Sequence, residues 1–309
     1  MDSTVHPITV GSDPQYRKLN RWTNILPYDH TRVKLKVVDG DEKCSDDYIN
    51  ANFLVGYRTS KDYIATQGPL TATIPDFWRM VWEQESSVLV MLSAFQEVDP
   101  VSLNIFISHM TGYTLIYQHI TPKTYSDYRY VKHFFFKSWT DHKADISPSD
   151  LINFVNTVRD EAESHPPGPI VVHCSAGVGR TGTFIAVDYF CRYIKELSKK
   201  SKLSKITDVM GSLRGSWVKR KSVLWEDSPI DVYGRIIALR DCRRYMVQTK
   251  SQYAFIYDTV MELIRRGARG DDLSESGCDT ESCLSEPLPA AGTSGTSDAV
   301  YDDVDVLKQ

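Results

Sequence analysis

The residues of this chain that are best suited to chemistry lie in one short stretch, residues 171–180, where a thiol and an arginine bracket a glycine-rich segment. Between Cys174 and Arg180 stand residues of small or flexible type: Ser175, Ala176, Gly177, Val178 and Gly179. Because no bulky side chain intervenes, their backbone N–H groups can converge on one anion. A helix that begins near Arg180 adds its positive dipole end, and the guanidinium can hold two phosphate oxygens at once. The stretch therefore predicts a phosphate site between a strand and a helix.

The same arrangement predicts a reactive sulfur at Cys174. A thiol surrounded by N–H dipoles at a helix N-terminus, and close to an arginine, is expected to ionise to the nucleophilic thiolate. The alternative is a buried structural cysteine at the end of a core strand, which is the usual environment of a free cysteine. That alternative explains neither the two glycines nor the arginine. We therefore predict that Cys174 is a nucleophile and that Arg180 binds the phosphate.

Residues 173–181 resemble the signature of the cysteine-dependent protein tyrosine phosphatases of receptor type, HCxxxxxR followed by Ser or Thr. The resemblance implies an α/β fold with a highly twisted mixed sheet and helices on both sides. It also implies that the Thr181 hydroxyl helps the thiolate leave a phosphocysteine intermediate. His173 would hydrogen-bond the loop or tune the thiolate rather than act as a base. Flanking motifs at residues 21–29 and 246–249 favour the tyrosine-specific branch over a rhodanese or a lipid phosphatase.

Two further stretches resemble family motifs that meet the substrate. Trp22 lies in a segment similar to the recognition loop, at a position where tyrosine is usual, and its ring would form one wall of a phosphotyrosine slot. The alternative for Trp22 is a surface side chain packed against the domain. Asn24, in the same segment, would contact the substrate backbone. Gln248 matches the glutamine that positions the hydrolytic water, and Gln252 would be a second amide beside it.

The acid loop departs from the family pattern. Residues 137–142, Lys-Ser-Trp-Thr-Asp-His, occupy the place of the mobile Trp-Pro-Asp loop, so Asp141 aligns with the general acid and Thr140 replaces the proline. A hairpin whose glutamate buttresses the arginine is missing after Glu97. Residues 201–227 look like an insertion, which is expected to form a solvated loop.

These residues imply a two-step phosphoryl transfer on phosphotyrosine in proteins. The Cys174 thiolate attacks phosphorus while Asp141 protonates the leaving oxygen, and water positioned by Gln248 then cleaves the thiophosphate with Asp141 as base. Neither a metal nor another cofactor is expected, because the loop amides and Arg180 supply the charge stabilisation.

Two alternatives stay open. One is a phosphotyrosine-binding pseudophosphatase in which acid-loop closure is impaired. The other is a poorly folded product of an unusual transcript, which soluble expression and a cooperative melt would exclude. The joint presence of Asp141 and Gln248 favours the enzyme, because a binding module needs neither.

Alternating and 3.6-residue patterns predict the elements that position these residues. Short apolar or alternating runs predict strands, and prolines or a serine cap followed by an apolar stripe predict helices. The expected strands are residues 48–53, 63–67, 87–93 and 171–173, and the expected helices are residues 74–82, 148–158, 183–200 and 253–264. The resemblance to the family implies a further helix at residues 230–234.

Composition is ordinary for a soluble globular protein, with 309 residues, 41% hydrophobic and 25% charged. The six cysteines form no CxxC pair and lack nearby ligand-spaced histidines, so neither a zinc site nor a disulfide framework is predicted.

No apolar run is long enough to span a bilayer, and no signal peptide is recognisable. We expect a monomer in the cytoplasm, either as a free protein or as the intracellular part of a receptor.

The net charge of −4 is unevenly distributed. Residues 271–309 carry ten acidic side chains and one lysine, a net charge of −9, which leaves +5 on residues 1–270. A mildly basic body suits an anionic substrate, and the absence of a dense Lys/Arg stripe argues against nucleic acid as a partner. The predicted organisation is a mobile arm at residues 1–15, a phosphatase domain at residues 16–266 and an acidic disordered tail at residues 267–309.

Overall fold

The computed structural model describes residues 6–38, 45–93, 116–120, 129–136, 139, 145–165, 168–199 and 230–269, which all belong to one compact unit. For residues 116–120 it describes the backbone alone. Several predictions fall outside the described residues: those for Thr140 and Asp141, for the insertion at 201–227 and for residues 270–309 of the acidic tail. Residues 267–269, which are predicted to belong to the disordered tail, instead form the end of the last described helix.

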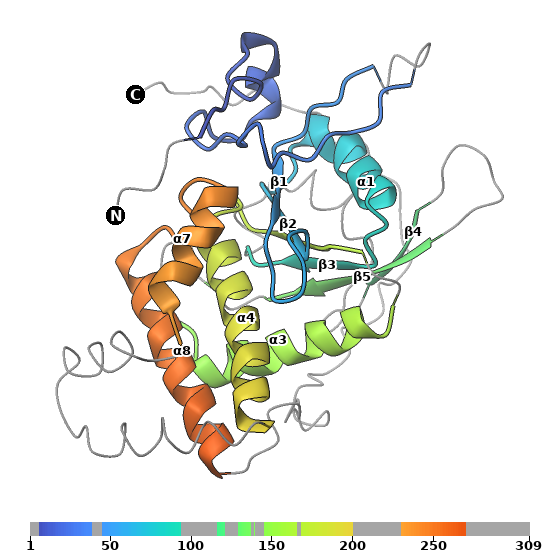
Figure 1. Cartoon of the computed structure of the whole chain (residues 1–309). Helices are drawn as coiled ribbons and strands as arrows, with labels where there is room; N and C mark the ends of the chain where they lie inside the picture. Colours follow the sequence, from blue (N-terminus) through green and yellow to red (C-terminus); the bar gives the residue numbers. More distant parts are fainter. Residues whose placement is uncertain are drawn as a thin grey trace, which may run out of the picture. The chain divides into compact units, whose positions relative to one another are not determined.

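A six-stranded mixed sheet forms the centre of the described structure (Figure 1). The strand order is β1(Ala51–Leu54), β2(Tyr63–Thr66), β6(Ile170–His173), β3(Val88–Met91), β5(Arg129–Phe135) and β4(Ile116–Ile120). The four inner strands are parallel, and each edge strand pairs antiparallel with its neighbour. The carboxyl ends of the inner strands therefore meet at one edge of the sheet, where open α/β sheets place their sites. Cys174 follows β6 at this edge.

Helices cover both faces of the sheet, as the sequence predicts. The larger core joins one face to helices α3(Pro148–Glu163), α4(Gly179–Lys199), α7(Val232–Cys242) and α8(Lys250–Arg269), and the smaller core joins the other face to α1(Ile74–Glu83) (Figure 1). Alternation along β6 divides the two cores, because Val172 packs in the larger one and Val171 in the smaller one. Two short 3-10 helices, η1(Pro14–Leu19) and η3(Thr71–Thr73), complete the described helices.

Local sequence explains where the helices next to the site begin. Ser147 caps α3 by accepting a hydrogen bond from the Ser149 N–H at 3.2 Å, and Pro148 stands in the first turn. The helix after the signature begins at Gly179, which agrees with the helix start predicted near Arg180 and precedes the predicted amphipathic stretch by four residues. Arg180 consequently lies in the first turn of α4, next to its positive dipole end.

The N-terminal segment contacts the domain in the structure. The sequence predicts a mobile arm at residues 1–15, whereas described residues of that arm hydrogen-bond to Asp29 in the structure. The N–H groups of Thr9 and Val10 donate to the Asp29 carboxylate at 2.8 and 3.0 Å, and the Asp29 N–H donates to the Pro7 carbonyl at 2.9 Å. The Asp29 carboxylate thus accepts hydrogen bonds from two backbone N–H groups of this segment and holds it against the domain, although the segment has few apolar residues to bury.

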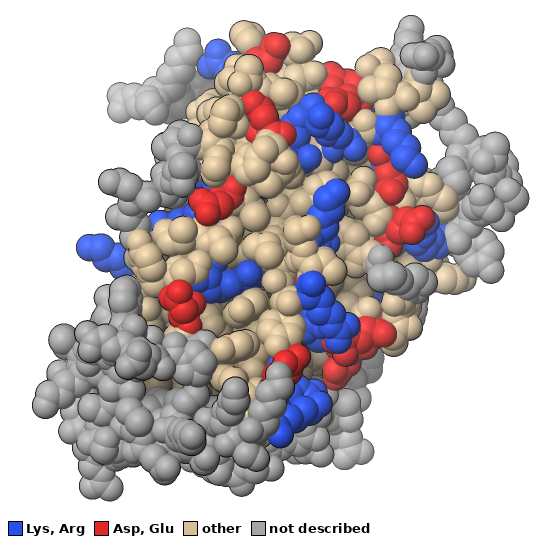
Figure 2. Space-filling view, viewed as in Figure 1, with Lys and Arg blue, Asp and Glu red and all other residues tan. Residues whose placement is uncertain are grey.

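Charges of both signs are intermixed on the face shown in Figure 2, where no patch of a single sign dominates. Within the part of the chain that the structure describes, no helix is both long and apolar enough to cross a membrane.

Candidate active site

Cys174 lies in a cavity of about 180 Å³ at the carboxyl edge of the sheet. Three separate stretches of the sequence contribute to the wall, and they are the stretches that the sequence analysis selects. The lining residues are Trp22, Asn24, Ile25, Cys174, Ser175, Ala176, Gly179 and Gln248. The Trp22 side chain, 48% exposed, therefore borders the same cavity as the thiol, while Cys174 is 3% exposed.

The loop that follows Cys174 directs its carbonyl groups away from the thiol. The Ser175 carbonyl accepts a hydrogen bond from the Gly68 N–H at 2.9 Å, and the Val178 carbonyl accepts one from the Val247 N–H at 3.1 Å. A trans peptide unit carries its N–H antiparallel to its C=O, and the described chain has no cis peptide. The N–H groups of these peptide units therefore point to the opposite side from Gly68 and Val247. One loop amide reaches the thiol, because the Gly177 N–H donates to Cys174 Sγ at 3.3 Å.

Position 177 requires glycine mainly because of the backbone conformation of the loop and its close contact with Thr66, and less because an anion needs space there. Its φ is +70°, a conformation that side chains rarely adopt, and a Cβ there would lie 2.1 Å from the Thr66 carbonyl oxygen. The glycine thus lets the loop turn while pressed against the end of β2. The sequence predicts glycine here for amide convergence, and the structure adds this close approach as its physical cause.

Arg243, which the sequence analysis did not select, holds the other two carbonyls of the loop. Its side chain is fully buried, and its guanidinium donates to the Gly177 carbonyl at 3.0 Å and to the Ala176 carbonyl at 3.1 Å. The remaining donors bind the side-chain oxygens of Asn52 at 2.7 Å and Asn50 at 2.8 Å. Burial lowers the pKa of Arg243 to about 10, so the guanidinium stays charged at neutral pH. Two charge-assisted hydrogen bonds therefore hold the loop carbonyls, and two more fix the guanidinium on Asn50 and Asn52.

Arg180 is fully buried, and its Nη1 donates to the Trp139 carbonyl at 2.9 Å. Trp139 is itself buried, with its ring 6.0 Å from that of Phe136 and 6.3 Å from that of Phe255. The arginine of the signature and the segment that leads into Thr140 are thus joined by a hydrogen bond. Sequence reasoning places both on the phosphate site but does not reveal this contact.

The recognition loop is anchored to the phosphate loop through residues at the end of β2. The Arg21 N–H donates to Gln67 Oε1 at 2.9 Å, and Arg21 Nε donates to the Gly68 carbonyl at 2.9 Å. Gly68 in turn donates to Ser175. Gln67 is thus a positioning residue that the sequence analysis treats only as part of a core strand. This connection fixes where Trp22 stands relative to the thiol.

The two glutamines lie against the last residue of the phosphate loop. A Cβ on Gly179 would come within 3.0 Å of Gln252 Nε2 and 3.3 Å of Gln248 Oε1. Gln252 is buried, and its Oε1 accepts hydrogen bonds from the N–H groups of Gln248 at 3.1 Å and Thr249 at 3.2 Å. Its Nε2 and the buried Thr181 Oγ1 have no hydrogen-bond partner among the described residues. Gln252 therefore positions Gln248 at the cavity rather than lining the cavity itself.

His173 is buried behind the thiol and is uncharged at neutral pH. Its Nδ1 lies 3.4 Å from the Cys174 carbonyl, and its ring lies 6.4 Å from that of His133. Burial lowers the pKa of His173 to about 4, with Arg21 and Arg180 acting in the same direction, and burial lowers that of His133 to about 3. A neutral imidazole cannot stabilise a thiolate by its charge. The hydrogen-bonding role expected of His173 is therefore the one that its environment permits.

We expect the free energy of unfolding to decrease as the pH falls from about 6.5 toward 4. In this window the unfolded chain protonates both histidines, whose ordinary pKa is about 6.5, whereas the folded chain protonates neither, so stability rises with pH. Each histidine contributes up to about 1.4 kcal/mol per pH unit. Urea denaturation at several pH values should show that the free energy of unfolding depends less steeply on pH for His133→Phe than for the parent. Equal slopes for the parent and His133→Phe would contradict the assignment.

In the described part of the chain, no group of three His, Cys, Asp or Glu side chains could hold a metal ion. Fold and site together define a mixed α/β protein with a buried thiol that accepts a hydrogen bond from a loop amide, next to the N-terminus of α4. The family model described as protein-tyrosine phosphatase matches residues 16–125 and 107–262. The chain belongs to the protein-tyrosine phosphatase family, as its signature indicates.

Similar curated proteins are receptor-type phosphatases. The chain is 36% identical over 269 residues to receptor-type tyrosine-protein phosphatase S of Gallus gallus, covering 80% of this chain and 15% of that protein. It is 37% identical over 268 residues to receptor-type tyrosine-protein phosphatase eta of Mus musculus, covering 81% and 19%. The Lar-like tyrosine-protein phosphatase of Caenorhabditis elegans is 33% identical over 267 residues, covering 81% and 11%. The chain thus spans less than a fifth of the length of each of these relatives.

Proposed function

We propose that this chain hydrolyses phosphotyrosine in proteins through a phosphocysteine intermediate on Cys174. The observation that carries the proposal is the orientation of the loop between Cys174 and Arg180. Hydrogen bonds hold its carbonyls outward, and the Gly177 N–H already donates to the sulfur. Such a preorganised ring of donors stabilises negative charge on a phosphoryl group without reorganisation during the reaction.

The first step uses the thiolate and the loop. Cys174 Sγ attacks phosphorus in line, the S–P bond forms, and the bond to the phenolic oxygen breaks. The loop N–H groups and Arg180 hold the nonbridging oxygens, while Asp141 gives its proton to the leaving oxygen. The Trp22 ring at the cavity rim supplies a flat surface on which the phenol can stack.

The second step regenerates the thiolate. Gln248, which lines the cavity, orients a water molecule toward phosphorus, and Asp141 takes the proton of that water as the S–P bond breaks. The unpartnered Thr181 hydroxyl is available to donate to the departing thiolate. The phosphate leaves with the oxygen that came from water, and no cofactor is needed for the balance of atoms or charge.

The rival function, a phosphotyrosine-binding pseudophosphatase, is suggested by Thr140 and by the hairpin missing after Glu97, both of which lie outside the described residues. All other residues of the two steps are described and surround the same cavity or the same loop. An intact water-positioning pair, Gln248 held by Gln252, favours the enzyme, because binding without hydrolysis does not use it. Partners of the chain are accordingly phosphotyrosine-containing proteins, and its place of action is the cytoplasm, as in signalling by dephosphorylation.

The test is turnover of matched phosphopeptides by the purified chain. We expect release of phosphate from a phosphotyrosine peptide and from p-nitrophenyl phosphate, equally with and without EDTA, and little release from the phosphoserine peptide of the same sequence. Saturable binding of the phosphotyrosine peptide without phosphate release would replace this proposal with the pseudophosphatase. Soluble expression with a single cooperative melt excludes a misfolded product.

A further inference from the structure

A second cavity, of about 200 Å³, lies between α3, α4 and the turn that joins β1 to β2. It shares no lining residue with the cavity at Cys174. Arg192, on its wall, follows Arg180 by twelve residues on the same helix, which corresponds to about 18 Å at the rise of an α-helix. The two cavities are therefore separate sites of similar size.

Five cationic side chains line this second cavity: Arg58, Arg159, Arg192, Lys195 and Lys199. Three of them recur on one face of α4 at spacings of three and four residues, where like charges destabilise a helix rather than stabilise it. Among the described residues, Lys195 and Lys199 have no ion-pair partner. Glu196 lies on the same wall, four residues after Arg192 and three before Lys199, and offsets only part of the repulsion among the three cations.

Most acidic side chains of the wall are already engaged. The Asp188 carboxylate is 2% exposed and binds the Arg159 guanidinium at two points, one of them 3.2 Å long. Glu196 accepts a hydrogen bond from the Tyr57 hydroxyl. Asp160 lies exposed at the rim. The buried pair of Arg159 with Asp188 thus fixes the floor of the cavity between α3 and α4.

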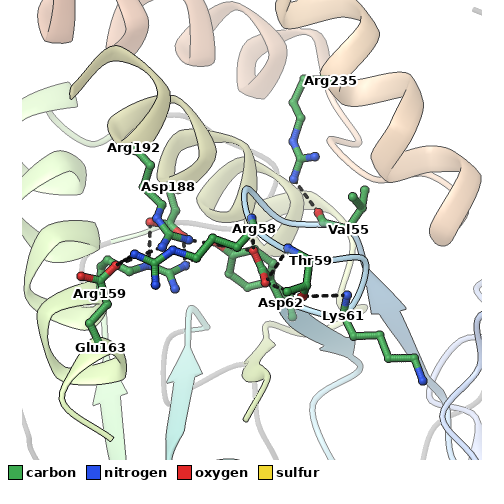
Figure 3. Close-up of polar contacts among 11 residues, drawn as sticks. Val55, Arg58, Thr59, Lys61, Asp62, Arg159, Glu163, Asp188, Arg192 and Arg235 are labelled. Carbon is green, nitrogen blue, oxygen red and sulfur yellow. Dashed lines mark hydrogen bonds and ion pairs between the residues drawn. The ribbon is translucent and has the colours of Figure 1, made fainter. Parts of the chain in front are cut away.

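Glu163 is the acid that joins the cations at the mouth of the cavity. One of its oxygens, Oε1, accepts hydrogen bonds from both Arg58 Nη2 at 3.1 Å and Arg192 Nη2 at 3.0 Å (Figure 3). Two guanidiniums from distant parts of the sequence therefore converge on a single oxyanion. The Glu163 side chain is 42% exposed and that of Arg58 is 64% exposed.

A phosphate group would bind these guanidiniums more strongly than Glu163 does. The exposed pair of Arg58 with Glu163 contributes only about 0–1 kcal/mol, so its replacement by a phosphate contact loses little on the Arg58 side. A phosphomonoester carries nearly two negative charges and three strong acceptor oxygens, and its bonds to arginine are short and often bidentate. Lys195 and Lys199 lie within the same wall to balance the additional charge.

We propose that this cavity is a phosphomonoester site, separate from the catalytic one, in which Glu163 occupies the guanidinium pair when no ligand is bound. Tyr57 contributes a flat wall for the organic part of the ligand, with Arg192 lying over its ring at 5.5 Å from the centroid. Either a small organic phosphate or a phosphorylated side chain of a peptide carries the required group.

Amide ¹H–¹⁵N spectra of the full chain can test this, because each site reports through its own amides. The ligands are inorganic phosphate, O-phosphoserine and a phosphoserine peptide, at constant ionic strength. We expect saturable shifts at residues 58–62 and 192–199, independent of those at residues 175–180. Glu163→Gln should lower the dissociation constant at the first set up to about fivefold, and Arg58→Ala should raise it about fivefold. Neither variant should change binding at residues 175–180.

Glu262→Gln and Arg265→Ala are the matched controls. They remove a similar exposed pair on α8, where Arg265 Nη1 lies 3.2 Å from Glu262 Oε2, and should leave both sets of shifts unchanged. If the phosphoserine peptide binds more tightly than O-phosphoserine, the ligand of the second cavity is a phosphorylated segment of a peptide. If the two bind equally, the ligand is a small organic phosphate. Absence of saturable shifts near Arg58 and Arg192, or an unchanged constant for Glu163→Gln, would reduce the cluster to a surface ion-pair network.

Discussion

Replacement of Cys174 by serine is expected to abolish phosphate release while phosphotyrosine binding persists. The hydroxyl of serine stays protonated in the same ring of donors and is a far weaker nucleophile than a thiolate. The ring itself does not depend on the sulfur, because Arg243, Gly68 and Val247 hold its carbonyls. We expect turnover of p-nitrophenyl phosphate to fall by more than about 10³-fold. The dissociation constant of a phosphotyrosine peptide, measured by calorimetry, should change little.

Cys242→Ser is the control for this substitution. Cys242 is a half-buried thiol on α7, outside the cavity, and burial raises its pKa, so it stays protonated at neutral pH. Its replacement should leave turnover unchanged. Hydrolysis by Cys174→Ser above the background rate would show that the nucleophile is a different group. Loss of peptide binding by the same variant would instead show that the sulfur organises the loop.

Two substitutions in the acid loop are expected to act in opposite directions. Proline at position 140 would restrict its own φ and the conformation of the residue before it. A proline that fits the ordered conformation typically stabilises it by about 0.4–1 kcal/mol, because the less ordered state then has fewer conformations to lose. Thr140→Pro should therefore raise kcat two- to fivefold if the natural threonine only disfavours closure. Asp141→Ala should lower kcat about 100-fold or more, because a general acid contributes at least that much. It should also trap the bound substrate.

The dependence of kcat on pH separates these roles. An acidic limb should report thiolate formation in every variant, while a basic limb should be present in the parent and in Thr140→Pro but absent from Asp141→Ala. Asp145→Ala, which removes an exposed carboxylate four residues further along, is the matched control and should retain both limbs. A parent that already lacks the basic limb, with an Asp141→Ala rate equal to its own, would establish the pseudophosphatase.

The sequence predicts the parts of the site whose residues lie close together along the chain. A strand, a tight loop and a helix start are all specified within the twelve residues from Val171, so the position of the thiol beside the arginine follows from local geometry. Helix starts at Pro75 and Ser147 follow from local caps in the same way. The amphipathic pattern of α4 is recognisable only from residue 183, because the glycines that weaken a helix belong to its first turn.

The amino-acid sequence by itself determined which chemical groups this site contains. Residues 174–180 place a thiol, several backbone amides and a guanidinium in one loop and the start of the helix that follows it. Only the tertiary structure decided which way those amides point, because the carbonyls are oriented by Arg243 and Gly68, and Arg243 lies 66 residues from Gly177. Likewise, Arg58 and Arg192 belong to separate polar faces, and packing of the β1–β2 turn against α3 and α4 brings them onto one carboxylate oxygen. Contacts of such separation are set by the burial of apolar faces elsewhere, so no local pattern encodes them.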